Sequence, residues 1–203
     1  WRMDGVTEYV LEGNINYAGA VISWLQNDLG LIESPGDTAA AIERSNKEDE
    51  TVLIPAFSGL SAPYWDEGVR AMFYGMSRTT SKNELIKAAV ESIAYQIADI
   101  LNAMAGDSGL TLKEVKADGG PSKNTYLMQF LSDMAKTTVR VSAEEELSAI
   151  GAAYMAGIAA GVYRREELFS HREYIDYHSN MEQAEWKKRV DRWYEAIYVL
   201  LRK

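Results

Sequence analysis

The sequence predicts an α/β fold in which parallel strands are joined by crossover helices. From residue 82 onward the hydrophobic patterns follow the order helix, strand, helix, strand, helix, which is typical of parallel strands with helical connections. Residues 114–117 alternate in hydrophobicity like a strand, and the pattern breaks at Gly119-Gly120 before it restarts as a helix. With 203 residues, 47% of them hydrophobic, the chain is long enough to bury the core of one such domain.

The first quarter of the chain predicts one strand end and two helices. Residues 9–11 are interpreted as the end of a strand that Gly13 terminates. Apolar residues at helical spacing then predict an amphipathic helix over residues 16–29. Residues 33–50 are polar and predict a loop with one short helix that begins near Thr38.

The next segments predict two strands, an aromatic loop and the longest helix. The apolar run at residues 51–57 is typical of a buried strand, and residues 71–76 predict another. Residues 58–66 between them form a loop rich in glycine, proline and aromatic side chains. An alanine-rich helix is predicted from residue 82 to residue 105, ended by Gly106. We expect the earlier strands to include antiparallel pairs.

The C-terminal part predicts one more strand and two helices. The strand covers residues 138–141, and the helix over residues 148–161 is so rich in small residues that we expect it to pack closely. The last amphipathic helix covers residues 181–201. The simplest organisation is one domain over residues 1–163 and a helical extension over residues 164–203 packed on the same domain.

The glycine pair at residues 119 and 120 is the strongest local indication of a binding site. A turn between a strand and a helix brings bare backbone and the positive end of the helix dipole to a ligand, a recurrent way of holding a nucleotide. Ser122 is predicted to cap the helix, and Asn124 could point back at the ligand. On the pattern alone, a tight connection without any ligand remains the more common explanation.

Composition excludes several classes of protein. The net charge is −9, from 30 acidic and 21 basic residues, and the basic residues form no cluster that would favour a nucleic-acid partner. The absence of cysteine excludes disulfides and thiolate sites, and with only two histidines a zinc site is not expected. The apolar run at residues 149–163 is too short to span a bilayer. We expect no membrane segment and a cytoplasmic setting.

Several segments in order along the chain resemble the FGGY carbohydrate kinases. The segment FSGLSAPYWD resembles a segment of the glycerol kinase branch, and AMFYGMSRTTSKNELIKAAVESIAYQ fits the second signature pattern of the family. DGGPSKNTYLMQFLSDM is similar to its adenosine-binding strand, turn and helix, and SAIGAAYMAGIAAG to the helix that follows. EYVLEGNINYAGAVISWLQ resembles a further segment near the start of the chain.

The resemblance implies a ribonuclease H-like fold of the actin, hexokinase and chaperone ATPase type, with a mixed sheet flanked by helices. In such kinases ATP lies in the cleft between two lobes, and this chain resembles most of the C-terminal lobe. The polyol-binding residues and the catalytic aspartate are then expected upstream of Trp1. No catalytic residue and no metal ligand is therefore expected here, and the chain alone should be inactive.

By the same resemblance, five residues match or adjoin the nucleotide contacts of the family. Gly120 and Asn124 match contacts to the nucleotide, with Gly119 beside them, and Gly19 matches a contact on the opposite wall of the pocket. Ser23 stands where glycerol kinases carry a glutamine that also touches ATP. Serine is too short for the same contact, so either a water bridges the gap or the contact is absent.

The implied activity is transfer of a phosphoryl group from ATP to a hydroxyl group of glycerol, with Mg²⁺ held mainly by the triphosphate and by residues outside this chain. Two alternatives stay open: a kinase for a pentulose or another sugar, and a non-catalytic actin-like module. The sequence leaves a homo-oligomer open.

The aromatic residues Phe57, Tyr64 and Trp65 are expected to pack rather than stack on a sugar. Glu91 is expected to form a structural ion pair or a buried hydrogen bond.

Overall fold

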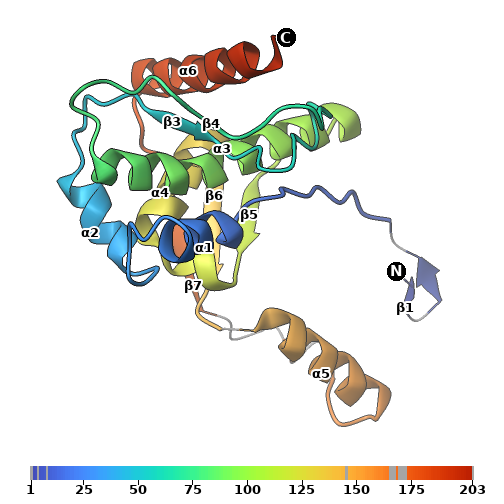
Figure 1. The fold of residues 1–203 in the computed structure, drawn as a ribbon. Coiled ribbons are helices and arrows are strands. Elements are labelled where there is room, and N and C mark those ends of the chain that lie inside the picture. The colour runs from blue at the N-terminus through green and yellow to red at the C-terminus, as the bar shows by residue number, and fades with distance from the viewer. Residues whose placement is uncertain are drawn as a thin grey trace.

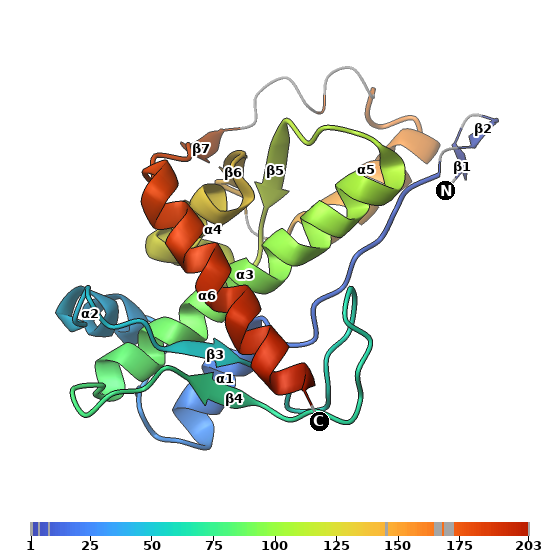
Figure 2. The ribbon, with the colours of Figure 1, turned by 90° about the horizontal axis from the view of Figure 1, so that it is seen from above.

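A long central helix organises the fold. The computed structural model describes residues 2–3, 5–7, 9–144, 146–164, 168 and 173–202. In it, helix α3 (Lys82–Ser108) runs through the middle of the body, with strands β3 and β4 on one side and strands β5, β6 and β7 on the other (Figures 1 and 2). Helix α6 crosses over the top of this arrangement in Figure 1.

The strands among the described residues form three small sheets. Their bounds are β1 (Arg2–Met3), β2 (Val6–Thr7), β3 (Val52–Ile54), β4 (Met72–Tyr74), β5 (Glu114–Ala117), β6 (Thr138–Ser142) and β7 (Tyr174–Tyr177). Strands β1 and β2 pair antiparallel, as do β3 and β4. Strand β5 pairs parallel with β6, and β7 pairs antiparallel with the other side of β6. The predicted parallel pair and the predicted antiparallel pairing of the earlier strands are both confirmed.

The helices agree with the sequence analysis in order and in approximate position. Besides α3, they are α1 (Gly19–Asn27), α2 (Asp37–Arg44), the short 3-10 helix η1 (Gly120–Lys123), α4 (Thr125–Ala135), α5 (Leu147–Ala159) and α6 (Gln183–Leu201). Helix α3 begins at Lys82 because Ser81 and Glu84 form a capping box. It continues past Gly106, the predicted end, and stops at Gly109, whose left-handed conformation closes the last turn.

The core lies where α3 meets its neighbours. Residues Ala88 to Tyr95 of α3 are buried without interruption, because α2, α4 and β3 pack on different sides of this helix. Trp193 of α6 is also buried, and its ring stacks on Tyr95 at a centroid distance of 4.8 Å. Burying a large apolar side chain contributes about 1.5–3 kcal/mol, so this contact fixes α6 to the body.

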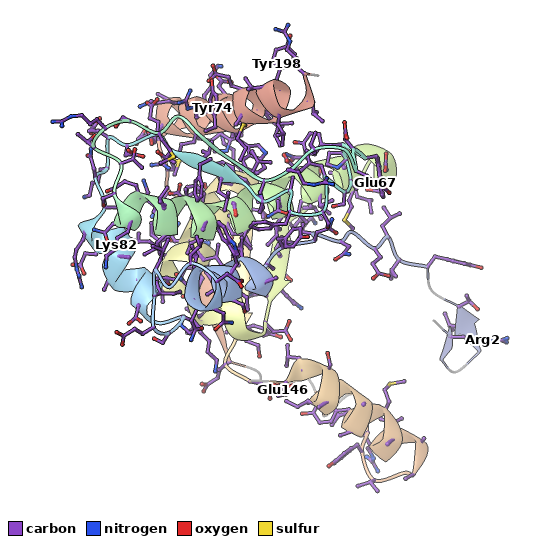
Figure 3. All side chains as sticks on the ribbon, in the orientation of Figure 1. Arg2, Glu67, Tyr74, Lys82, Glu146 and Tyr198 are labelled. Carbon is purple, nitrogen blue, oxygen red and sulfur yellow. The ribbon has the colours of Figure 1, made fainter. Side chains whose placement is uncertain are left out.

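Two expectations about elements were wrong, and one strand was missed. The segment at residues 9–11 is not in a strand, and Tyr9 is 93% exposed. Helix α5 has no buried residue and projects away from the body, so the predicted close packing is not seen (Figures 1 and 3). Strand β7 was not anticipated, because only a helix was expected after residue 163. The domain boundary at that residue stays a prediction.

Among the residues that the structure describes, no helix combines the length and the apolar character that crossing a membrane requires.

Candidate functional site

The turn after β5 is open and depends on glycine. Gly119 has φ 85° and ψ −179°, a conformation that is accessible to glycine and almost to no other residue. A Cβ atom built on Gly119 or Gly120 would meet no atom within 4 Å. Ser122 closes the turn from inside, since its Oγ donates a 2.7 Å hydrogen bond to the carbonyl of Gly119. A side-chain hydrogen bond therefore supports the backbone of this turn from within, while its glycines face open space.

The position of the turn suits a ligand. It follows the carboxyl end of β5, which pairs parallel with β6, and ligands of open α/β sheets bind at the carboxyl ends of the strands. The lower side of the fold in Figure 1, away from α6, holds α1, α2 and this end of β5. The turn and these helices thus share one side of the molecule.

Asn124 caps helix α4, and the prediction that Ser122 would do so was wrong. The chain first makes one 3-10 turn, so the helix begins two residues later than expected. Asn124 Oδ1 accepts a 3.0 Å hydrogen bond from the backbone N–H of Leu127, and Nδ2 donates a 3.1 Å bond to Oγ1 of Thr38. Asparagine is among the preferred N-cap residues because its side-chain oxygen satisfies an otherwise unpaired N–H group.

Thr38 is the residue that the sequence analysis missed at this site. It was noted only as the start of a short helix, and it lies 86 positions from Asn124 in the sequence. No local pattern could connect the two, because their contact exists only once α2 has docked beside α4.

Gly19 and Ser23 lie apart from the turn, on helix α1. Gly19 is the first residue of that helix, and a Cβ atom on it would meet nothing within 4 Å. Ser23 follows one helical turn later, on the same face, and is exposed. The structure thus brings Gly119, Gly120 and Asn124 together in one turn, whereas Gly19 and Ser23 form a second surface on another element.

The described residues offer no metal centre. Within residues 9–144, 146–164 and 173–202, no group of three or more histidine, aspartate or glutamate side chains is arranged to hold a metal ion.

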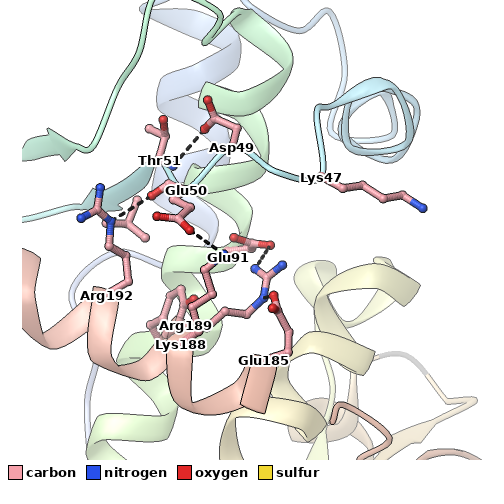
Figure 4. Close-up of a pocket in the computed structure, with 11 residues that line it drawn as sticks. Lys47, Asp49, Glu50, Thr51, Glu91, Glu185, Lys188, Arg189 and Arg192 are labelled. Carbon is pink, nitrogen blue, oxygen red and sulfur yellow. Dashed lines mark hydrogen bonds and ion pairs between the residues drawn. The ribbon is translucent and has the colours of Figure 1, made fainter. Parts of the chain in front are cut away.

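A pocket between α6 and residues 47–52 contains none of the five predicted site residues, and several of its charged side chains form ion pairs (Figure 4). Arg189 lies 3.3 Å from the buried carboxylate of Glu91 and 2.6 Å from Glu185. Lys188 lies 2.5 Å from Glu50. Burial alone would lower the pKa of Arg189, but the neighbouring Glu91 raises it above the ordinary value. We interpret this cluster as the attachment of α6, which confirms the predicted structural role of Glu91.

The aromatic loop packs onto the body, as expected for two of its three aromatic residues. Phe57 makes edge contacts with Tyr17 and Trp24, at centroid distances of 4.9 and 4.8 Å. The hydroxyl of Tyr64 donates a 2.6 Å hydrogen bond to Asp99 of α3, and burial together with this carboxylate raises the pKa of Tyr64. Trp65 is 77% exposed.

Comparison with known proteins agrees with the resemblance. Residues 3–160 match the C-terminal domain of the FGGY family of carbohydrate kinases. The chain is 38% identical over 199 residues to the glycerol kinase of Halalkalibacterium halodurans, covering 97% of this chain and 40% of that protein. It is 44% identical over 171 residues to the glycerol kinase of Geobacillus sp. (strain WCH70), covering 84% of this chain and 34% of that protein. The chain thus spans about 40% of the length of the glycerol kinase from Halalkalibacterium halodurans.

Solved structures give the same answer for the fold. The crystal structure of Plasmodium falciparum glycerol kinase with ADP superposes with a TM-score of 0.81 at 32% identity, covering 91% of this chain and 37% of that one. Xylulose kinase from Lactobacillus acidophilus has a TM-score of 0.75 at 22% identity, covering 93% of this chain and 39% of that one, which supports the fold alone. The predicted ribonuclease H-like α/β lobe is confirmed. The chain belongs to the FGGY family of carbohydrate kinases and contains the C-terminal domain of that family.

Proposed function

We propose that this chain is the nucleotide-binding part of an ATP-dependent kinase that phosphorylates a hydroxyl group of glycerol. The observation that carries the proposal is the open turn from Gly119 to Asn124, at the carboxyl end of a parallel strand, in a chain similar to glycerol kinases. The similar structure from Plasmodium falciparum contains ADP, which supports a nucleotide as the ligand.

Four of the five predicted residues have a part in this proposal. The backbone of Gly119 and Gly120 can approach the adenosine and the first phosphate, since no side chain covers it. Asn124 offers amide groups to the base, and Gly19 on α1 leaves the opposite wall equally bare. ATP supplies the phosphoryl group when bound. The catalytic base is not among the residues assigned here, and no step is assigned to a metal ion.

Ser23 favours a second candidate, a kinase for a pentulose or another sugar. Glycerol kinases carry a longer glutamine at this position, whereas Ser23 is exposed and short. A coupled assay of the full-length protein with glycerol, xylulose and other polyols decides between the candidates. A cytoplasmic location, a homo-oligomer and the absence of a nucleic-acid partner stay predictions from the sequence.

Nucleotide binding by the full-length protein tests the proposal. Gly120→Val and Asn124→Ala should each weaken ADP binding about tenfold or more in calorimetry, because one fills the open turn and the other removes the amide. Trp65→Ala is the matched control, since this side chain is exposed on another loop. If both variants bound ADP like the unmodified protein, the proposed site would have to be abandoned. The 203-residue chain alone should not phosphorylate glycerol.

A further inference from the structure

The side chain of Asn124 is held in one orientation by a buried threonine. Thr38 lies in the first turn of α2 and is 2% exposed. Its hydroxyl donates a 2.7 Å hydrogen bond to the carbonyl of Pro35. A hydroxyl has a single proton, so the oxygen that faces Asn124 presents only lone pairs and must accept. The Nδ2 group of Asn124, 3.1 Å away, is the donor that this oxygen requires.

The other end of the amide is fixed as well. Oδ1 of Asn124 accepts the N–H of Leu127 at 3.0 Å in the N-cap of α4. If the amide rotated by half a turn, Nδ2 would face the N–H donor of Leu127, and Oδ1 would face the lone pairs of Thr38. Both contacts would then be repulsive. Thr38 and Leu127 together therefore determine that Nδ2 of Asn124 faces Thr38 and Oδ1 faces Leu127.

The fixed amide keeps two groups free for a ligand. An asparagine side chain has two N–H donors and two oxygen lone pairs, and the two contacts above use one of each. One donor and one acceptor remain, on a side chain that is only partly buried, next to the bare turn of Gly119 and Gly120. Adenine presents a donor and an acceptor side by side on its edge, whereas guanine presents two acceptors at the corresponding positions.

We propose that Thr38 is a positioning residue of the nucleotide site, which orients Asn124 so that the site prefers adenine over guanine nucleotides. This inference rests on the proposed function, because it requires the turn to bind a nucleotide. It adds a residue from another helix and a specificity that depends on its hydroxyl group.

The variants follow from the hydrogen bonds. Thr38→Val keeps the shape of the side chain and removes the hydroxyl, whereas Thr38→Ser keeps the hydroxyl. Ser45→Ala is a matched control, because Ser45 is also buried at α2 and also donates to a carbonyl three residues earlier, that of Ile42 at 2.7 Å. Its hydroxyl has no hydrogen bond to Asn124, so its loss tests a structural contribution of α2 alone.

The experiment measures Kd for ADP and for GDP in the full-length protein by calorimetry. Thr38→Val should weaken ADP binding about tenfold and reduce the preference for ADP over GDP by a similar factor, as expected for one lost hydrogen bond. Thr38→Ser and Ser45→Ala should both keep the ADP affinity and the preference for ADP over GDP of the unmodified protein.

The alternative results are distinguishable. Unchanged ADP affinity and preference in Thr38→Val, with binding lost in Gly120→Val, would overturn this inference and leave the proposed function standing. Equal weakening by Thr38→Val and Ser45→Ala would also overturn it, since the role would then be structural. Unchanged binding in Gly120→Val and Asn124→Ala would remove the proposed function itself. If Thr38→Val does not fold, Asn124→Asp decides: it keeps the cap and loses the donor, so an unaltered ADP preference would contradict the inference.

Discussion

Two glycine-containing connections in this molecule use glycine for opposite reasons. In the aromatic loop at residues 57–66, a Cβ atom on Gly59 would lie 2.6 Å from the Cα atom of Glu67, so glycine makes room for the protein's own backbone. In the turn at residues 118–124, a Cβ atom on Gly119 or Gly120 would meet nothing within 4 Å. Glycine there leaves a surface uncovered.

The two connections are also held differently. The aromatic loop is closed by paired backbone hydrogen bonds between Leu60 and Asp66, at 2.8 and 3.0 Å, and anchored through Tyr64 to a buried carboxylate. The turn is held by small hydroxyl groups, Ser122 from within and Thr38 from outside. The space beside the glycine is thus what distinguishes the candidate binding site from the packed loop in this molecule.

Gly59→Ala should produce the largest loss of stability. The residue has φ 96°, and the added methyl group would lie 2.8 Å from the carbonyl oxygen of Asp66 as well as against Glu67. Because both neighbours are backbone atoms, they cannot move aside cheaply, and we expect a loss of roughly 3 kcal/mol or more. Urea unfolding followed by circular dichroism measures it. A loss below about 1 kcal/mol would contradict the packed interpretation of this loop.

Gly119→Ala should cost less, about 2 kcal/mol. Its φ of 85° is unfavourable for alanine, but the added methyl group meets open space, so only the backbone conformation contributes. Gly120→Ala is the control, since Gly120 has no such φ and the same open surroundings. The comparison between the connections would fail if Gly119→Ala were as destabilising as Gly59→Ala in the same urea experiment.

Acid should weaken the attachment of the loop that follows α2, the helix that carries Thr38. The carboxylate of Glu84 accepts 2.6 Å hydrogen bonds from the backbone N–H groups of Asn46 and Ser81. Burial would raise its pKa, but these bonds outweigh burial and lower the pKa from 4.5 to about 2. A lowered pKa stabilises the folded state above pH 4.5, and this stabilisation is lost as the pH falls toward 2.

The expected loss from Glu84 is on the order of 1.5 kcal/mol by about pH 3. Urea unfolding at several pH values measures it as the difference between the unmodified protein and Glu84→Gln, which cannot titrate. Parallel curves for the two proteins between about pH 5 and about pH 3 would show that this carboxylate does not carry the effect.

Tyr64→Phe should produce the smallest of these changes, about 1 kcal/mol. The substitution removes one hydrogen bond to Asp99, whose carboxylate keeps the 2.8 Å bond from Trp193 and the 3.1 Å bond from Tyr194. ADP binding by the full-length protein should not change, because this loop is not part of the proposed site. Weakened ADP binding in Tyr64→Phe would mean that the two connections are not independent.

Local chemistry made much of the fold predictable. The start of α3 could be read at Lys82, because the capping box that fixes it involves only Ser81 and Glu84. The break after β5 was equally visible in the glycine pair. The parallel pairing of β5 with β6 followed from the order of elements, because a helix between two strands brings the chain back to the end of the sheet where the first strand began.

The remaining features depend on contacts between distant residues. Ser122 and Asn124 are both good cap residues, and Asn124 is used because Ser122 lies inside the 3-10 turn that precedes the helix. Strand β7 has only four residues and pairs with the free edge of β6, so its local sequence alone does not predict it. The contact of Asn124 with Thr38 forms only when α2 packs near the start of α4. The glycines of the candidate site were therefore predictable from the sequence, whereas the hydrogen bond that orients Asn124 was not.

The buried carboxylate of Glu91 has a consequence for how sequences of this kind can diverge. It accepts a hydrogen bond from Tyr126 of α4 and pairs with Arg189 of α6, so one side chain joins three helices. Loss of the arginine alone would leave the buried carboxylate with only the more distant Lys87, at 3.8 Å, as a cationic partner, which is more costly than loss of both arginine and glutamate. We therefore expect positions 91 and 189 to change together. A related chain that replaces the arginine should replace the glutamate as well.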